Sequence, residues 1–364
     1  MMRTTTAAMT AAMTGAVAGV MLGGLSLAGP ATAEPTQIVV SSTIQAAVDL
    51  AQPGDTIVVP AGVYRESVLI NKAGLTVVGA PGAVLDGEGL GARTGLSVRA
   101  PAGTRLAGFT LRGLQVQNFD FTGVLVSGVD GFRLTGTTYV DNEVYGLFPV
   151  RCSHGRVDHN TVSGSQDSGV YVGQCSEVLV DHNVAHRNTV GIEIELSTHI
   201  DVLDNVATDN AIGAMVQVLP GLPATATDDI LVRGNVLSGN DRPNPVVQEP
   251  GGPFEPLALL PGGVGVVNVA GDNVRIEDNI VNGNPSVGIA VVSLPPELVP
   301  PGSPVDPAPD GGVVIGNVTS GNGRDPDPRL SPLPGADVVW DGTGSTCFTV
   351  SRAARTFPSP LPAC

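Results

Sequence analysis

Residues 183–195 read NVAHRNTVGIEIE, and this stretch contains the pattern that decides the fold. Two asparagines stand five residues apart, a glycine follows the second, and apolar residues then alternate with glutamates. Asparagine and glycine are typical of tight turns because both adopt left-handed backbone conformations readily. Alternation with a period of two is typical of a strand that buries one face. The stretch therefore predicts two bends followed by a short strand.

The pattern recurs along the chain. Asparagine pairs with the same spacing lie at 183/188, 205/210, 235/240, 279/284 and 317/322. Gly123, Gly146, Gly169, Gly191 and Gly213 precede strand-like segments at intervals of 22 or 23 residues. A coil of this length cannot bury its own apolar face, so coils stack and share one core. We predict an all-β fold, a right-handed single-stranded parallel β-helix of roughly nine or ten coils. A leucine-rich repeat is disfavoured because its leucine framework is missing.

Four segments are expected along the chain. Residues 1–33 have the apolar run and the Ala31-Thr32-Ala33 site of a signal peptide, with an uncleaved anchor as the alternative. Residues 34–72 form an N-terminal cap and the first strands, including a short capping helix that begins near Thr43. Residues 73–325 form the parallel β-helix, and residues 326–364 form a C-terminal cap or tail. We expect a secreted or periplasmic protein.

Charge restricts the partners of the protein. The formal net charge is −16, and Lys72 is the chain's single lysine. Such an acidic surface repels phosphate backbones, so we expect no nucleic acid partner. After residue 33 no apolar run is long enough to span a membrane. We expect a monomer whose partner is a polysaccharide or a cell-envelope glycan.

Four cysteines fit an oxidising compartment. We expect a disulfide between Cys347 and Cys364, which would staple the C-terminal tail. Cys152 and Cys175 lie one coil apart, each six residues after its strand glycine, so a second disulfide is expected there. A stack of two unbonded cysteines is the alternative.

The strand register predicts which side chains face outward. Counting from each strand glycine, positions +1 and +3 point into the core, and positions +2 and +4 point out. The outward positions and their edges supply the substrate-binding candidates Phe148, Arg151, Tyr171, Met215 and Gln217. The catalytic candidates on the same face are Glu193, Glu195 and Asp167. Aromatic rings beside carboxylates are typical of a saccharide groove, although paired glutamates are also common on a solvated strand.

Three proline-rich insertions interrupt the period, at about residues 219–227, 241–262 and 293–310. They either wall a binding face or are tolerated surface loops. His159 and His182 occupy the same turn position one coil apart, which fits a metal pair or an ordinary polar turn. No cofactor or metal is specified by the sequence, and Ca²⁺ stays open because aspartates lie near these turns.

Segments near the N-terminus resemble known proteins. Residues 43–47 (TIQAA), 53–59 (PGDTIVV) and 62–64 (GVY) look like the start of bacterial right-handed β-helix proteins of the pectin-lyase-like superfamily. The asparagine and glycine period extends that resemblance over most of the chain. The superfamily includes polysaccharide lyases, glycoside hydrolases, pectin esterases and mannuronan C5-epimerases, so the resemblance implies a carbohydrate-active fold without fixing the reaction.

Residues 145–149 (YGLFP), 169–174 (GVYVGQ) and 191–195 (GIEIE) look like an exported bacterial subgroup of this superfamily without assigned activity. The epimerases carry a Tyr-Gly-x-Asp-Pro-His segment in a comparable coil. Here Phe148 and Val150 stand in place of its aspartate and histidine, which argues against that mechanism. β-Helix copper-delivery proteins are further relatives, but after residue 33 Met215 is the single methionine, which argues against a Met-rich copper site.

Three functional hypotheses follow. The leading one is a secreted protein that binds or cleaves a polysaccharide, as a lyase or a hydrolase, on the outward face. The second is a non-enzymatic binding or scaffold protein of the cell envelope. The third is a metal-handling accessory protein. Whether the protein is an enzyme is left open by the sequence.

Overall fold

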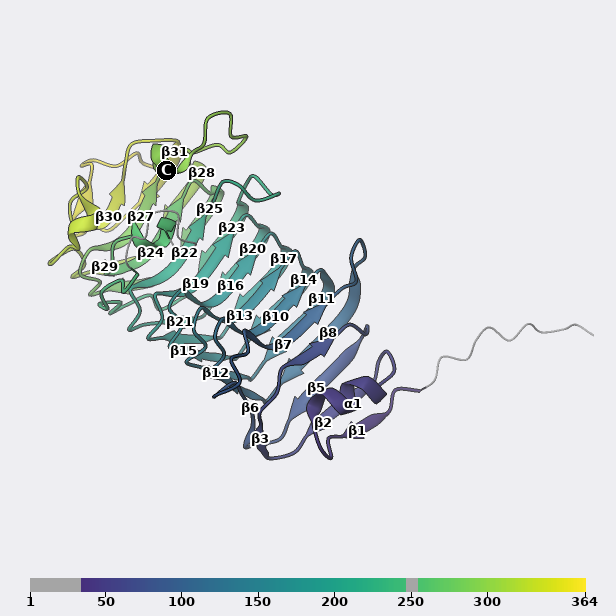
Figure 1. The fold of residues 1–364 in the computed structure, drawn as a ribbon. Coiled ribbons are helices and arrows are strands. Elements are labelled where there is room, and N and C mark those ends of the chain that lie inside the picture. Colours follow the sequence, from purple (N-terminus) through teal and green to yellow (C-terminus); the bar gives the residue numbers. More distant parts are fainter. Residues whose placement is uncertain (1–33, 247–254) are drawn as a thin grey trace, which may run out of the picture. The chain divides into compact units, whose positions relative to one another are not determined.

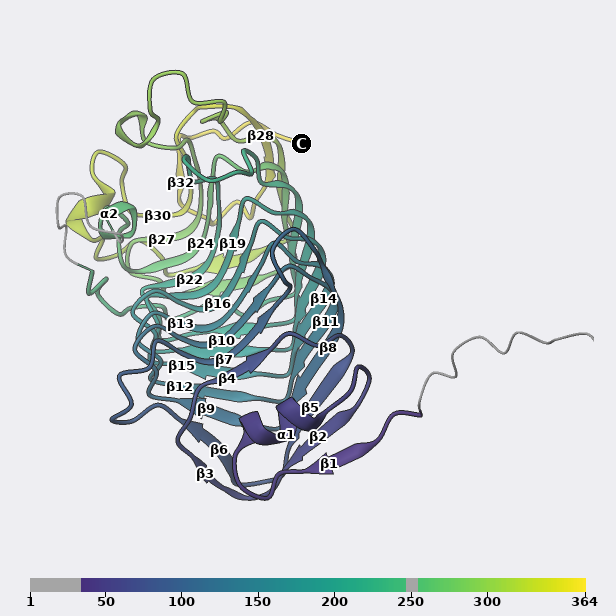
Figure 2. The same ribbon diagram turned by 45° about the vertical axis from the view of Figure 1, so that its right-hand side comes forward.

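A computed structural model describes residues 34–246 and 255–364, and the described residues from Pro35 onward wind into one stack of coils (Figure 1). Successive coils add neighbouring strands to three sheets, here named A, B and C. Strand pairs within all three sheets are parallel, as the strands stacked side by side in Figure 2 show. The predicted all-β parallel β-helix is therefore confirmed.

The strand bounds follow this order. Sheet A contains β1 (Gln37–Val39), β2 (Thr56–Val59), β5 (Leu75–Gly79), β8 (Leu106–Arg112), β11 (Val129–Thr135), β14 (Ser153–Asp158), β17 (Ser176–Asp181), β20 (Thr198–Leu203), β23 (Asp228–Arg233), β25 (Asp272–Glu277), β28 (Asp310–Ile315) and β31 (Ser345–Thr349). Sheet B contains β3 (Gly62–Tyr64), β6 (Ala83–Asp86), β9 (Gln115–Gln117), β12 (Thr138–Val140), β15 (Thr161–Ser163), β18 (Val184–His186) and β21 (Val206–Ala207). The pair β26 (Ile280–Asn282) and β29 (Val318–Ser320) continues the column of sheet B through a bridge at Val236. Sheet C contains β4 (Val68–Ile70), β7 (Thr94–Arg99), β10 (Thr122–Ser127), β13 (Tyr145–Val150), β16 (Ser168–Gly173), β19 (Val190–Glu195), β22 (Ile212–Gln217), β24 (Val264–Val269), β27 (Val287–Val292), β30 (Ala336–Trp340) and β32 (Thr356–Phe357).

Among the described residues, helices are few and short. They are α1 (Ile44–Leu50), α2 (Glu255–Ala258) and the 3₁₀ turns η1 (Pro296–Leu298) and η2 (Pro328–Leu330). In the part of the chain that the structure describes, none is long and apolar enough to cross a membrane. The expected signal peptide, residues 1–33, lies outside the described residues.

Helix α1 forms at the predicted place and covers the first coil. The Thr43 hydroxyl accepts a hydrogen bond from the Ala46 N–H at 3.1 Å, which caps the start of the helix. Ile44 and Val48 are almost fully buried and pack into the core. The Lys72 ammonium group donates to three carbonyl oxygens at the end of the helix, each at 2.8 Å. A cation at this end is favourable because the carbonyl groups there lack partners within the helix.

Two columns of asparagine hold the coils in register. The side-chain amide of Asn183 donates to Oδ1 of Asn205 at 2.9 Å, and that of Asn205 donates to Asn235 at 3.0 Å. A second column includes Asn188 and Asn210, joined at 3.1 Å. These side chains are buried, so each bond satisfies a polar group that would otherwise lose its hydrogen bonds to water. The repeated asparagines are therefore structural.

Apolar side chains form two clusters. The inner cluster runs through the coils and contains the inward residues of the three sheets, such as Val170, Ile192 and Ile194. The outer cluster lies on the outward face of sheet C and includes Met215 and Val267. Helix α2, which stands beside β27 and β30 in Figure 2, contributes to this outer cluster.

Candidate active site

Strand pairing in sheet C brings the predicted outward residues into one column. Tyr171 of β16 pairs with Glu193 of β19, and Glu193 pairs with Met215 of β22. The Phe148 ring, one coil earlier, lies 4.5 Å from the Tyr171 ring. Glu195 pairs with Gln217 in the neighbouring column. The register deduced from the strand glycines therefore places these side chains side by side.

This face is covered, although the sequence suggested an open one. Tyr171, Glu193 and Met215 are only 5%, 3% and 1% exposed. Side chains of the three insertions, including Ala224, Leu260 and Leu298, pack against the outer cluster. The cover has a physical reason, because outward apolar residues on sheet C would otherwise face water. Two interpretations were left open for the insertions. The structure favours insertions that cover the outward face of sheet C over loose surface loops.

Three carboxyl groups gather under this cover, and we call Asp167, Glu193 and Glu195 the carboxylate cluster. The Ser168 hydroxyl contacts both Asp167, at 3.0 Å, and Glu193. The Tyr171 hydroxyl donates to Glu195 at 2.8 Å. All three predicted catalytic residues are thus brought together from β16, β19 and the turn before β16.

Gln217 connects two members of the carboxylate cluster. Its side-chain N–H₂ donates to Glu193 Oε1 at 2.6 Å and to Glu195 Oε2 at 3.1 Å. These two oxygens are therefore no more than 5.7 Å apart, the sum of the two distances. Gln217 is half-buried, so it forms the border between the cluster and the space beyond it.

The cluster has neutral hydrogen-bond donors and no cationic partner among the described residues. Burial raises the pKa of Asp167 to about 6 and that of Glu195 to about 7. Burial, followed by the charges of the other two carboxyl groups, raises the pKa of Glu193 well above its usual value. Near neutral pH the cluster therefore holds both protonated and ionised carboxyl groups, as acid and base catalysis requires.

Aromatic rings form one wall of the site. Tyr145 stacks on Phe148 with ring centroids 4.5 Å apart and nearly parallel planes. Tyr145 and Tyr171 lie 5.3 Å apart. Burial raises the pKa of both tyrosines well above the usual value, so they remain neutral hydroxyl donors. Phe148 and Tyr145 are half-buried and keep part of their rings accessible.

A cavity of about 270 Å³ opens beyond Gln217. Outward residues of β22, β24 and β27 form its floor, including Val267 and Ala290. Its walls come from all three insertions and from the chain around η2. Gln217 lines this cavity and also binds the cluster, so the two features share one side chain.

Arg151 is not part of this assembly. It lies exposed at the turn after β13, and its guanidinium donates to the Ser127 hydroxyl at 3.2 Å. Within the described chain it forms no ion pair with a carboxylate. Its predicted role in binding an acidic sugar stays a prediction.

Of the two expected disulfides, one is present and one is not. Cys347 and Cys364 form the expected disulfide. Cys152 and Cys175 are buried free thiols, so the second expected disulfide is wrong and the alternative stack is present. The Cys175 sulfur accepts a hydrogen bond from the Cys152 N–H, as the Ser197 hydroxyl does from the Cys175 N–H one coil later. These thiols therefore continue a column of side-chain to backbone hydrogen bonds.

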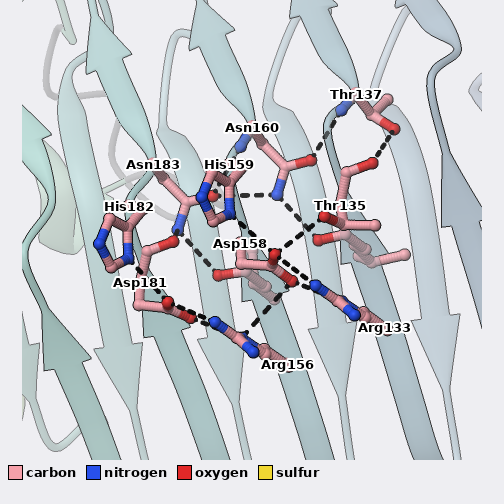
Figure 3. Close-up of polar contacts among 12 residues, drawn as sticks. Arg133, Thr135, Thr137, Arg156, Asp158, His159, Asn160, Asp181, His182 and Asn183 are labelled. Carbon is pink, nitrogen blue, oxygen red and sulfur yellow. Dashed lines mark hydrogen bonds and ion pairs between the residues drawn. The ribbon is translucent and has the colours of Figure 1, made fainter.

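His159 and His182 directly follow β14 and β17 of sheet A, and Figure 3 shows their polar contacts. Their rings stack with centroids 5.0 Å apart, and each Nδ1 lies within 2.9 Å of the preceding aspartate. The same aspartates accept paired hydrogen bonds from Arg133 and Arg156. Among residues 34–246 and 255–364, no three His, Cys, Asp or Glu side chains gather as metal ligands. The two histidines thus belong to a network of hydrogen bonds with aspartates that arginines also contact.

Sequence reasoning missed Tyr145 and Ser168, which both reach the carboxylate cluster. Each stands directly before a strand glycine, where strict alternation would place it inside. The glycine breaks the alternation, and Val190 and Ile212 at the same position face the outer cluster. Two of these four residues are apolar, so the outward direction of the position follows from the structure and not from residue type.

Comparisons with known proteins agree with this architecture. A family model described as a right handed beta helix region matches residues 98–295. The A-module of the Azotobacter vinelandii mannuronan C-5 epimerase AlgE6 has a similar fold, with a TM-score of 0.63, 16% identity, and coverage of 88% of this chain and 92% of that one. The DFA-IIIase of Arthrobacter chlorophenolicus A6 gives a TM-score of 0.55 and 13% identity over 88% and 90% of the two chains.

An alginate lyase from Paenibacillus sp. gives a TM-score of 0.50 and 14% identity, with coverage of 85% of this chain and 99% of that one. No curated protein matches the sequence. Identities this low support the fold alone. The family match, by contrast, spans more than half of the chain and coincides with the observed coils. The chain therefore belongs to the right-handed β-helix family, as its resemblance to the pectin-lyase-like superfamily predicted.

Proposed function

We propose that the protein is a glycoside hydrolase whose carboxylate cluster cleaves a neutral glycan. The supporting observation is the burial of three carboxyl groups with neutral donors and no cationic partner in the described chain. Ion-paired structural carboxylates have lowered pKa values, whereas these have raised ones. Carboxyl groups with raised and separated pKa values are the groups that glycoside hydrolysis uses.

Two roles fall to the cluster. Burial raises the pKa of Asp167 and that of Glu195 into the range where one carboxyl group is ionised while the other is protonated. The ionised group serves as the base, which takes a proton from water, and the protonated group serves as the acid, which gives its proton to the glycosidic oxygen. Water is thereby added across the cleaved bond. Glu193 stays protonated and positions the other groups through Ser168 and Gln217.

The surroundings of the cluster favour an uncharged sugar. An acidic sugar would meet further carboxylates, and no arginine or lysine of the described chain forms an ion pair with the cluster. The chain as a whole carries a net charge of −16, which also repels anionic polysaccharides. The partly exposed rings of Tyr145 and Phe148 offer an apolar surface on which a sugar face can stack.

A non-enzymatic role in glycan binding or as an envelope scaffold is the second candidate. Glu193 and Glu195 are only 3% and 4% exposed, which favours a cluster that stabilises the fold. Gln217 also occupies the space between their carboxyl groups. For catalysis, substrate must displace this side chain from at least one carboxylate.

The test is turnover of a panel of neutral and acidic polysaccharides by the purified protein, with and without Ca²⁺. A hydrolase releases new reducing ends without absorbance at 235 nm, whereas a lyase produces both signals. The E193Q/E195Q double variant should lose activity by at least about 100-fold, in line with removal of acid catalysis. The matched control is E143Q, because Glu143 is an exposed glutamate outside the cluster.

Either of two results would reject a hydrolase that works through the carboxylate cluster. One is full activity of the double variant, which would place the reaction elsewhere. The other is glycan binding without product release, which would favour the scaffold. Circular dichroism of both variants shows whether a loss of activity reflects a loss of fold.

A further inference from the structure

The cavity beyond Gln217 has an aliphatic lining. Leucine, valine, isoleucine, proline and alanine supply most of its surface, and none of the described residues that line it is aromatic. Its polar side chains are largely engaged with protein partners. Asp341 accepts hydrogen bonds from the backbone N–H and the hydroxyl of Ser293, at 2.6 and 2.7 Å. Arg329 donates to the Asn244 carbonyl oxygen at 3.3 Å.

Such a space is poorly suited to water or sugar. The cavity is partly open to solvent, but an ordered water makes two to four hydrogen bonds and finds few free polar partners on this lining. A sugar ring would lose hydrogen bonds from most of its hydroxyl groups there. An alkyl chain has no hydrogen bonds to lose on entry, and it gains contact with Val267, Ala290 and their neighbours.

The position of the cavity links it to the carboxylate cluster. Glu193 pairs with Met215, and Met215 pairs with Val267 on the cavity floor. Adjacent strands lie about 4.8 Å apart, so the cavity begins within two strands of the cluster. Gln217 stands at the shared border. A ligand can therefore place a polar sugar at the cluster and an apolar tail in the cavity.

We propose that this cavity binds the alkyl chain of a lipid-linked glycan. This inference rests on the proposed function for the sugar end, and on the cavity alone for the tail. A cavity of about 150 Å³ accommodates benzene, with six carbon atoms. By the same ratio, about 270 Å³ accommodates a chain of about ten carbons.

The test is calorimetric titration with alkyl β-glucosides from butyl to tetradecyl, below the concentrations at which they form micelles, and with glucose. Affinity should rise about fourfold for each added methylene and level off near ten carbons. Free decanol tests the tail without a sugar, and it should compete with decyl glucoside. Equal affinity for glucose and decyl glucoside would overturn the proposal.

Two variants locate the tail. A290F fills the cavity floor and should abolish the dependence on chain length, whereas V184F adds the same ring at an exposed strand position and should not. L298D places a charge in the half-buried wall without enlarging a core residue. Its control is L222D, because Leu222 is an exposed insertion residue outside the cavity lining. Unchanged binding by folded A290F and L298D would overturn the site.

The E193Q/E195Q variant separates this proposal from the proposed function. It should bind decyl glucoside with the same dependence on chain length, because neither glutamate lines the cavity. Absence of turnover on every glycan would reject the hydrolase and leave the tail site standing. The tail site alone would be rejected if the protein turns over glycans, shows no preference for alkylated substrates and does not bind decyl glucoside.

Discussion

Sheets A and C both bury carboxyl groups on their outward faces, but the pKa values of these groups are lowered on sheet A and raised on sheet C. On sheet A, burial opposes ionisation of Asp158, yet hydrogen bonds from Arg133, His159 and Thr135 outweigh it and hold its pKa well below the usual value. Asp181 has a lowered pKa for the same reasons, with Arg156 as its main partner. On sheet C, burial dominates and the pKa values rise.

The difference shows that burial alone does not mark a functional carboxylate. Figure 3 shows each sheet A aspartate between an arginine and a histidine, an arrangement that satisfies the charge and leaves little for chemistry. The sheet C carboxyl groups are held by hydroxyls and one amide, so their protons can move. The partner of a buried carboxylate, more than its depth, separates the two roles.

The largest expected effect is an opposite response of the two faces to pH. Asp167 and Glu195 bind protons more tightly in the folded chain, so the free energy of unfolding should fall as pH rises from about 4 to 7. Each group contributes on the order of 3 kcal/mol. Asp158 and Asp181 have lowered pKa values, so their contribution should be lost as pH falls below about 4. Urea denaturation from pH 3 to 9 measures both limbs, and a flat curve between pH 5 and 8 would contradict the assignment for sheet C.

The next effect comes from removing one sheet A cation. R133M should lower the free energy of unfolding by about 2–3 kcal/mol at pH 7, because the buried Asp158 loses its paired hydrogen bonds. The value is discounted because the Arg133 side chain is 48% exposed. R112M on the preceding strand is the control, since Arg112 forms no ion pair within the described residues. Equal melting temperatures of the two variants would show that the pair contributes little.

The smallest effect is a gain from removing one sheet C charge. E195Q should raise the free energy of unfolding by about 1–2 kcal/mol at pH 8 and leave it nearly unchanged at pH 5, where Glu195 is already protonated in the folded chain. The gain is smaller than the free energy that corresponds to the full pKa shift of Glu195, because the new amide must form hydrogen bonds again with Gln217 and Tyr171. Thermal melting at both pH values checks this, and destabilisation at pH 8 would mean that the charge itself is needed for folding.

Local pattern was enough to predict the coil, the register and the capping helix. Asparagine pairs and strand glycines recur at nearly fixed intervals, so each repeat separately predicts the same turns and strands. The column of Tyr171, Glu193 and Met215 follows from that register. Asp167 was expected at the edge of the same face, and it lies in the coil that precedes the two glutamates.

The cover over sheet C could not be predicted in this way. The insertions have no period, and their contacts with the outer cluster join residues far apart in the chain, such as Ala224 and Leu298. From the sequence alone, the cluster therefore resembles an exposed strand face. The state of Cys152 and Cys175 was missed because one-coil spacing fits a bond and a stack equally well.

The asparagine columns have a consequence for how this protein can diversify. Asn205 binds Asn235 and Asn235 binds Asn279 directly, although 30 and 44 residues separate them. The length of the loop between two stacked asparagines therefore does not affect how the coils stack. Descendants of one ancestral chain can exchange or lengthen the loops over sheet C while the stack of coils keeps its shape. The surface that these loops form can therefore change by loop replacement alone, while the asparagine columns keep the coils stacked.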